Sequence, residues 1–190
     1  MPHLNRTRHA LLLAYASLTL SCCAGLDAQT RRRGEPVVEF RAAWIATVNN
    51  IDWPSKKGLS SAQLRRELDQ IVARSVELRL NALIFQVRAA GDAFYRSRLE
   101  PWSEWLTGTQ GEPPDGAFDP LRYMIDRCHR SGIQLHAWFN PFRCWHKAGR
   151  SKPHASHVTQ RAPHLTRHYG AYQWMDPGHT TSQKWTLAVI

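Results

Sequence analysis

Hydrophobic and polar positions alternate most clearly between residues 133 and 143. Apolar side chains occupy every second position from Ile133 to Phe139, which is the period-two pattern of a strand with two different faces. Asn140-Pro141 ends the pattern, because proline has no N–H for a sheet ladder and disfavours helix in the preceding residue. The pattern predicts a buried strand that runs into a polar, aromatic loop.

The same sequence of elements occurs twice earlier in the chain. Nearly apolar runs over 40–48 and 82–88 predict two more strands. Apolar positions at helical spacing predict helices from Ser61 to about Leu78 and from Pro120 to the stop at Gly132. A capping box of Ser60 with Gln63 begins the first helix, and Asp119-Pro120 begins the second. This alternation predicts a parallel α/β sheet or barrel.

The other segments are less regular. Residues 88–118 have no long periodic run, yet they carry large hydrophobic side chains that need to be buried, among them Phe94, Tyr95, Trp102, Trp105 and Leu106, so we expect an ordered loop packed over the strand ends. Residues 143–170 are basic and rich in histidine, and no periodicity predicts structure there. A short ordered stretch and turn is expected over 172–178. A third helix begins near Thr181, behind a second capping box of Thr180 with Gln183.

The formal net charge of +10 suggests a nucleic-acid binder until it is located along the chain. Residues 34–142 are neutral, whereas residues 1–33 carry +4 and residues 143–190 carry +6. A nucleic-acid domain would carry its basic stripe on the folded body. We therefore expect no nucleic-acid partner, although a basic binder of anionic polymers stays open as a third hypothesis.

The N-terminus has the pattern of an export signal. Arg6 and Arg8 precede an apolar run over 10–20, which is shorter than the about 20 residues that a spanning helix needs. Residues 1–24 are thus predicted to be a signal peptide and 25–38 a tether. Cys22 or Cys23 could become the lipidated first residue of a lipoprotein, with ordinary cleavage near Ala24 or Ala28 equally open. Either route predicts an exported protein in the periplasm, outer membrane or extracellular space of a bacterium.

Two further cysteines follow. Cys128 lies on the apolar stripe of the second helix, which favours a buried free thiol. Cys144 follows the third strand at its other end, so a disulfide with Cys128 is not expected, and no zinc spacing is present.

The sequence predicts only three strand–helix units, whereas a closed barrel has eight units and about 250 residues. Three parallel strands would also leave two long sheet edges open. The pattern therefore allows either a short open α/β sandwich or the front part of a larger fold.

Polar and aromatic residues gather where the three strands end, as in a sugar-binding site. Indole faces stack on the apolar faces of pyranose rings, and amides and carboxylates bind hydroxyls. The alternatives are core packing for Trp102, a positioning ion pair for Arg88 and Asp92, and an interior histidine for His136. The predicted substrate-binding residues are Asn50, Asp52, Trp53, Arg88, Asp92, Tyr95, Trp102, His136, Trp138, Asn140 and Arg143.

Glycoside hydrolysis needs two carboxyl groups at a defined separation. Asp52, Asp92, Glu100 and Glu104 are available, but sequence spacing places no pair, so the catalytic residues stay unknown. The histidines between 154 and 168 include metal-like spacings without an accompanying carboxylate, which favours a solvated loop. No cofactor or metal is expected.

Several of these segments resemble the glycosyl-hydrolase-like family of bacterial envelope lipoproteins. The resemblance runs in order from about Glu39 to Ile190. Ala89 stands where the family often has proline. The segments that carry it are FRAAWIATVNNIDWPS (40–55), FQVR (85–88), GDAFYRS (91–97), LEPWSEWLTG (99–108), FDPL (118–121) and HAWFNPFR (136–143).

The resemblance implies a (β/α)₈ TIM barrel with glycoside hydrolase activity. It also implies a fourth strand with an Asp-Gly-Ile-x-x-Asp-Asp-Tyr type of motif that holds the acidic catalytic residues, and this motif is absent from the sequence. The expected fold is therefore a partial, C-terminally truncated barrel of three strand–helix units over 39–190. The expected function is a glycoside hydrolase for a carbohydrate polymer or cell-envelope glycan, incomplete and inactive alone. The alternative is a non-catalytic carbohydrate-binding remnant.

Overall fold

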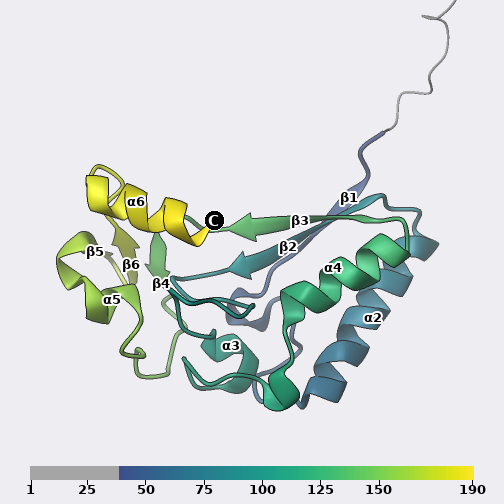
Figure 1. The fold of residues 1–190 in the computed structure, drawn as a ribbon, viewed down its shortest axis with the longest axis horizontal. Coiled ribbons are helices and arrows are strands. Elements are labelled where there is room, and N and C mark those ends of the chain that lie inside the picture. Colours follow the sequence, from purple (N-terminus) through teal and green to yellow (C-terminus); the bar gives the residue numbers. More distant parts are fainter. Residues whose placement is uncertain (1–38) are drawn as a thin grey trace, which may run out of the picture. The chain divides into compact units, whose positions relative to one another are not determined.

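Three parallel strands form the first sheet, in the order in which they follow one another along the chain. They are β1 (Ala42–Ile45), β2 (Ala82–Arg88) and β3 (Gln134–Phe139), and β2 lies in the middle. The computed structural model describes residues 39–190 (Figure 1). The predicted signal peptide and tether, with Cys22 and Cys23, lie outside the described residues.

Two helices cover one face of this sheet. Helix α2 (Ser61–Glu77) follows β1 and helix α4 (Pro120–Arg130) follows β2, and both pack on the same side (Figure 1). Leu64 and Leu68 of α2 and Met124 of α4 share a core with Leu83 and Phe85 of β2. A doubly wound sheet would carry helices on both faces. Sequential strands with helices on one side are compatible with a part of a TIM barrel.

Local chemistry explains where these helices begin and end. The Ser60 hydroxyl accepts a bond from the Gln63 N–H, and the Gln63 side chain accepts one from the Ser60 N–H, which confirms the predicted capping box. Asp119 caps α4 ahead of Pro120. Gly132 follows α4 with φ of +70°, a left-handed conformation that glycine adopts without steric cost.

The connection from β2 to α4 is an ordered loop, as predicted. It contains the short helix α3 (Glu104–Thr107) and the 3₁₀ turn η3 (Asp115–Ala117), while η2 (Val48–Asn50) follows β1. Main-chain bonds close the loop on itself, with Ala93 donating to Pro101 at 2.8 Å. Phe94, Trp105 and Leu106 join the same core as the strands. The loop therefore packs over the strand ends.

A second, antiparallel sheet lies within residues 143–175, where the sequence shows no clear periodicity up to Gly170 and so did not reveal it. Its strands are β4 (Arg143–Trp145), β5 (Thr166–Tyr169) and β6 (Tyr172–Met175), in the order β4-β6-β5. Helix α5 (Val158–Arg161) and η4 (Pro163–Leu165) cover one face. Strands of three or four residues are too short to show a periodicity.

Helix α6 (Thr180–Val189) follows the second sheet. Its cap is His179, whose ring nitrogen accepts a bond from the Thr181 N–H at 3.1 Å. The predicted capping box at Thr180 is therefore corrected to a histidine cap one residue earlier. Cys128 and Cys144 are both buried and free, and no helix of residues 39–190 is apolar over a long enough stretch to cross a membrane.

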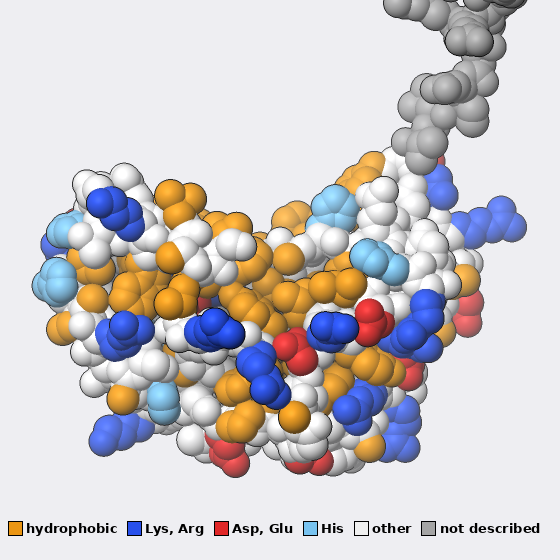
Figure 2. Space-filling view, in the orientation of Figure 1, with side chains coloured by type: hydrophobic (Ala, Val, Ile, Leu, Met, Phe, Trp, Pro, Cys, Tyr) orange, Lys and Arg blue, Asp and Glu red, His pale blue; other side chains and the backbone are white. Residues whose placement is uncertain are grey.

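The face of the parallel sheet opposite α2 and α4 is open. Trp44 is 61% exposed and Phe40 is 59% exposed on or beside this face. Within residues 39–190, β1 and β3 each pair on one side only. Figure 2 shows hydrophobic side chains gathered between α6 and α4, with Lys and Arg beside them. Large apolar surfaces of this kind are typical of contact with another part of a protein or a ligand.

Candidate functional site

The carboxyl ends of β2 and β3 meet the loop that follows β2, and buried polar side chains are concentrated there. Arg88 closes β2, where a register shift against β3 separates it from Gln86. Asp92 follows in the loop, and Asn140 begins the segment after β3. In barrels the residues just past the strand ends carry the chemistry, so this cluster is the candidate site.

Arg88 forms a buried ion pair with Glu100. Its Nε donates to one carboxylate oxygen at 2.7 Å and its Nη2 to the other at 2.6 Å, and neither side chain is exposed to solvent. Nη1 donates to the main-chain carbonyls of Asn140 and, at 3.1 Å, Pro141. Burial opposes the charged guanidinium, but Glu100 outweighs it and raises the pKa of Arg88. The sequence left a positioning ion pair with Asp92 open as the alternative to substrate binding; Arg88 does form an ion pair, but its partner is Glu100.

Asp92 is buried beside this pair and is held by neutral donors. One oxygen accepts a bond from the Ala90 N–H at 2.9 Å, and the other accepts one from the Ser103 hydroxyl at 2.7 Å. Burial raises the pKa of Asp92, against the lowering effect of these two bonds. The carboxyl group therefore favours its protonated form more than an exposed aspartate does.

The Ala89 carbonyl joins two predicted site residues. The side-chain amide of Asn140 donates to it at 3.0 Å, and Nε of Arg143 donates to it at 2.9 Å. The indole N–H of Trp138 in turn donates to the Asn140 side-chain oxygen at 3.0 Å. Trp138, Asn140 and Arg143 are all partly exposed. They thus form a connected polar edge at the end of β3.

The three predicted residues of the β1 loop separate in the structure. The amide of Asn50 donates to the carbonyls of Pro54 and Trp105, so it fastens the loop to α3. Asp52 accepts a bond from the Ala46 N–H and lines a pocket of about 650 Å³ between β1 and α2. Trp53 is buried against Phe85 in the core, so its ring packs there and offers no open face.

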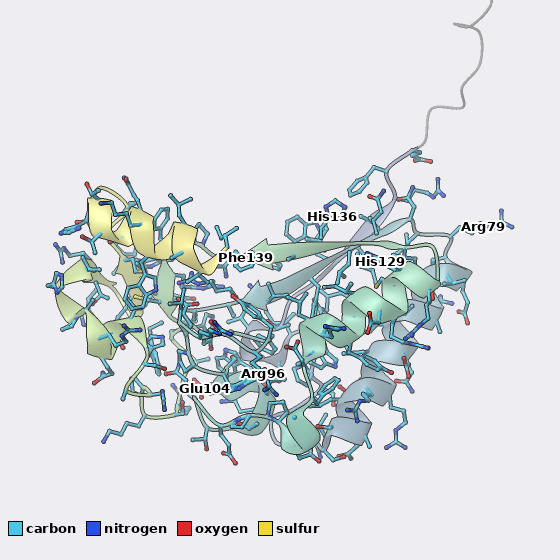
Figure 3. All side chains as sticks on the ribbon, in the orientation of Figure 1. Arg79, Arg96, Glu104, His129, His136 and Phe139 are labelled. Atoms are coloured by element: carbon cyan, nitrogen blue, oxygen red, sulfur yellow. The ribbon has the colours of Figure 1, made fainter. Side chains whose placement is uncertain are left out.

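Three predicted residues remain: Tyr95, which lies near Arg88 and Glu100, and Trp102 and His136, which lie away from that pair. The Tyr95 hydroxyl donates to the Val189 carbonyl at 3.3 Å, and burial raises the pKa of Tyr95 to about 12. Trp102 lines a separate pocket beside Phe118. His136 is exposed on the open side of β3, away from α4, and is not an interior histidine (Figure 3). Phe139 marks the other end of that strand, near the end of α6 (Figure 3).

All four candidate carboxylates accept hydrogen bonds from protein donors, and three of them are buried. Glu100 binds Arg88, and Asp92 binds Ser103 and the Ala90 N–H. Glu104 is also buried, and it accepts bonds from the Lys57 ammonium and from the N–H groups of Arg150 and Ser151. Asp52 alone of the four is exposed. The described residues therefore present no open pair of carboxylates for acid–base chemistry.

The histidines of 154–168 do not come together. His157 is buried, caps α5 by accepting a bond from Thr159, and its other ring nitrogen is 3.0 Å from the Ala90 carbonyl. Burial lowers the pKa of His157. Within residues 39–190, no group of three or more metal-ligating side chains is placed to hold an ion.

Sequence reasoning missed Ser103 and His157 as neighbours of Asp92, and it missed Tyr172 and Trp174 as strand residues. No pattern links Ser103 or His157 to Asp92, because 11 residues or more separate them in irregular segments. The alternation of Tyr172 and Trp174 with Gln173 and Met175 was a strand signal, although a short one.

Comparison with known proteins identifies the family. Residues 39–190 match the family described as Glycosyl hydrolase-like 10. "Glycosyl hydrolase YngK" of Bacillus subtilis is 41% identical over 141 residues, covering 74% of this chain and 27% of the relative. "Glycosyl hydrolase DigH" of Escherichia coli K12 is 31% identical over 212 aligned positions, covering 96% of this chain and 47% of the relative. The chain spans less than half the length of these relatives, and it belongs to the glycosyl hydrolase-like 10 family.

Proposed function

We propose that this chain is the front part of an exported glycoside hydrolase that acts on a carbohydrate polymer or a cell-envelope glycan. Residues 39–190 supply the first three strand–helix units of a (β/α)₈ barrel, and the end of β3 supplies part of the substrate-binding surface. The catalytic acids belong to a part of the barrel that these residues do not form.

This proposal depends on one observation: the polar edge lies at the end of a strand in a chain that matches the glycosyl hydrolase-like 10 family. Asn140, Trp138 and Arg143 form one connected edge at the carboxyl end of β3. That end is where barrel enzymes bind their substrates. Their amide, indole and guanidinium groups suit sugar hydroxyls and ring faces. The family match over the same residues favours a glycan as the ligand.

Two features support the idea that more of the barrel is needed. The relatives are longer, since the matched region covers 27% and 47% of their lengths. Within the described residues, the outer edges of β1 and β3 are unpaired and one sheet face is open. A barrel closes such edges by adding strands. The carboxylates of Asp92, Glu100 and Glu104 already bind protein donors. This is consistent with catalytic acids in another part of the barrel.

Export and membrane attachment are part of the proposal and rest on the sequence of residues 1–38 alone. A signal peptide would deliver the protein to the periplasm, the outer membrane or the medium. A lipid on Cys22 or Cys23 would hold it at a membrane. Metabolic labelling with a fatty acid tests this, with Cys22→Ala and Cys23→Ala as separate variants.

The alternative is a non-catalytic carbohydrate-binding protein. The absence of an open carboxylate pair among the described residues favours it for the chain taken alone. The two candidates make the same prediction for binding and differ only in what happens when the barrel is completed.

The purified chain should bind glycan without cleaving it. Tryptophan fluorescence should change when soluble cell-envelope glycan is added, because Trp138 lies in the polar edge and is partly exposed. Asn140→Ala should reduce the change, whereas Arg122→Ala on the far side of α4 should not. No new reducing ends should appear over hours. Rapid release of reducing ends by the chain alone would contradict the placement of the catalytic acids.

A further inference from the structure

The second sheet presents an aromatic and basic face that shares Arg143 with the polar edge of β3 and extends beyond it. Its covered face carries Cys144 and Met175, which pack with Val158 and Leu165 of α5 and η4. Side chains alternate between the two faces of a strand. Tyr172 and Trp174, the neighbours of Gln173, therefore lie on the uncovered face of β6.

The register of this sheet places Trp174 between two arginines. Trp174 is directly opposite Arg143 on β4 and Arg167 on β5. Residues that pair across antiparallel strands share one face, with Cβ atoms about 5 Å apart. Trp174 is 39% exposed, and the side chain of Arg167 is 58% exposed. The accessible Trp174 thus lies between two arginine positions in the register, with Arg167 exposed and Arg143 partly buried, its Nε donating to the Ala89 carbonyl.

Aromatic rings continue from Trp174 towards the strand ends of the first sheet. The Trp174 and Tyr172 ring centroids are 6.4 Å apart, and those of Tyr172 and His146 are 5.2 Å apart. His146 also contacts Trp105 of α3, the residue whose carbonyl binds Asn50. The row of rings therefore connects this face to the loops around the candidate site.

The arginines keep donors for a ligand. Arg143 uses Nε for the Ala89 carbonyl, and within residues 39–190 its two terminal amino groups make no hydrogen bond. Arg167 binds the carbonyls of His164 and Thr166 through Nη1, and its Nη2 is 3.6 Å from Asp176. Asp176 is the one acidic residue of 143–190, against seven Lys and Arg. The segment therefore has a net positive charge, and Arg143 and Arg167 bring part of it to the strands of this sheet.

We propose that Arg143, Arg167, Tyr172 and Trp174 form a binding platform for an acidic polysaccharide, with the indole stacked on a sugar ring and the guanidiniums on carboxylates of that or neighbouring sugars. Guanidinium groups bind carboxylates through two parallel hydrogen bonds, and an aromatic face accepts the apolar face of a pyranose. The platform rests on the proposed function, and it adds a substrate class: glycans that carry carboxylate groups.

Isothermal titration of the purified chain with two hexasaccharides tests the platform. Hexagalacturonate carries carboxylates and chitohexaose is neutral. We expect hexagalacturonate to bind at least about tenfold more tightly at low salt and to lose this advantage as salt rises, because screening weakens exposed charge pairs. Trp174→Ala should weaken hexagalacturonate binding about tenfold, and Arg167→Ala should weaken it about threefold to tenfold.

Matched variants separate the platform from general effects. Arg122→Ala removes another exposed guanidinium, 82% exposed on α4, and should bind hexagalacturonate like the parent chain. Trp174→Phe keeps an aromatic ring and guards against a folding defect. The proposal would be overturned by equal affinity for both sugars, by no binding of either, by a loss in the Arg122 variant equal to that in the Arg167 variant, or by tighter binding of single-stranded DNA. Because hydrolysis is not measured, these outcomes are separate from failure of the proposed function.

Discussion

Among single residues, Arg88 determines the geometry at the end of β3. Its guanidinium binds Glu100 on one side and the carbonyls of Asn140 and Pro141 on the other, and neither the Arg88 nor the Glu100 side chain is exposed to solvent. The turn that presents Asn140 is thereby fixed to β2. Arg88 is therefore a positioning residue, and the partly exposed groups on the turn are the ones that can meet a ligand.

Arg88→Met should destabilise the chain by about 3–5 kcal/mol, because it leaves the Glu100 carboxylate buried without its partner. Urea unfolding followed by circular dichroism measures the change. Arg74→Met is the matched control: Arg74 pairs with Glu77 on the surface, where both side chains are more than 60% exposed, and should cost about 0–1 kcal/mol. Similar losses in the two variants would mean that the buried pair does not hold the loop.

Asp92 should give the chain a pH-dependent stability. Its pKa is raised in the folded state, so the folded state binds its proton more tightly than the unfolded chain. The contribution of Asp92 is then fully present below its ordinary pKa of about 3.8 and is lost as pH rises through the folded value. Relative to Asp92→Asn, the parent chain should be most stable near pH 4 and lose that advantage as pH rises.

The comparison of parent and Asp92→Asn cancels only the groups that titrate independently of Asp92. His157, Glu100, Arg88 and Arg143 are the charged or titratable groups that interact with Asp92, and His157 has a lowered pKa. Unfolding free energies between pH 4 and pH 8 would provide the test. A difference that is flat over this range, or that grows with pH, would be incompatible with a raised pKa.

Sequence reasoning placed Arg88, Asp92 and Asn140 at or just past strand ends, and in the structure Arg88 closes β2, Asp92 lies in the loop after β2 and Asn140 follows β3. It did not find that Arg88 pairs with Glu100. The two are separated by 12 residues of irregular loop, and their contact depends on how that loop folds back over β2. The same limit applies to Trp53: the pattern places it in a loop, and only tertiary packing puts it in the core.

At the level of elements, helices and strands with long periodic patterns were predictable, and short ones were not. Helix α2 begins at Ser61 behind the Ser60 cap and has buried positions at helical spacing, so propensity, cap and pattern agree. The second sheet has strands of three or four residues. Its order β4-β6-β5 depends on pairing between strands, which a single sequence does not display.

Ser60→Ala should weaken α2 at its first turn. The variant removes the acceptor for the Gln63 N–H, and loss of such a cap costs about 0.5–2 kcal/mol. Thermal or urea unfolding would show the loss. Ser131→Ala, at the C-terminal end of helix α4, is the control. Within residues 39–190 the Ser131 hydroxyl makes no hydrogen bond, and only the Ser131 main chain caps the helix. A Ser60 variant as stable as the Ser131 variant would show that the Ser60 side chain does not stabilise α2.

At the level of the whole molecule, residues 39–190 resemble a segment of a barrel in two ways. The parallel strands follow one another in chain order with helices on one face, and the other face and the outer strand edges are open. Helices α2 and α4 complete one face of the sheet, while Trp44 and His136 stay exposed on the other. Family membership covers residues 39–190, and the relatives extend beyond the matched region. The central claim is that these residues form a substrate-binding part of a larger glycoside hydrolase.

A chimera tests this claim most directly. Residues 39–190 would replace the matching part of Escherichia coli DigH, and release of reducing ends from a glycan that DigH itself hydrolyses would be measured for the chimera and for the chain alone. The account predicts that the chimera cleaves glycan, that Asn140→Ala in the chimera lowers the rate at least about tenfold while Arg122→Ala does not, and that the chain alone is inactive. Cleavage by the chain alone, or a folded chimera that binds glycan and never cleaves it, would contradict the claim.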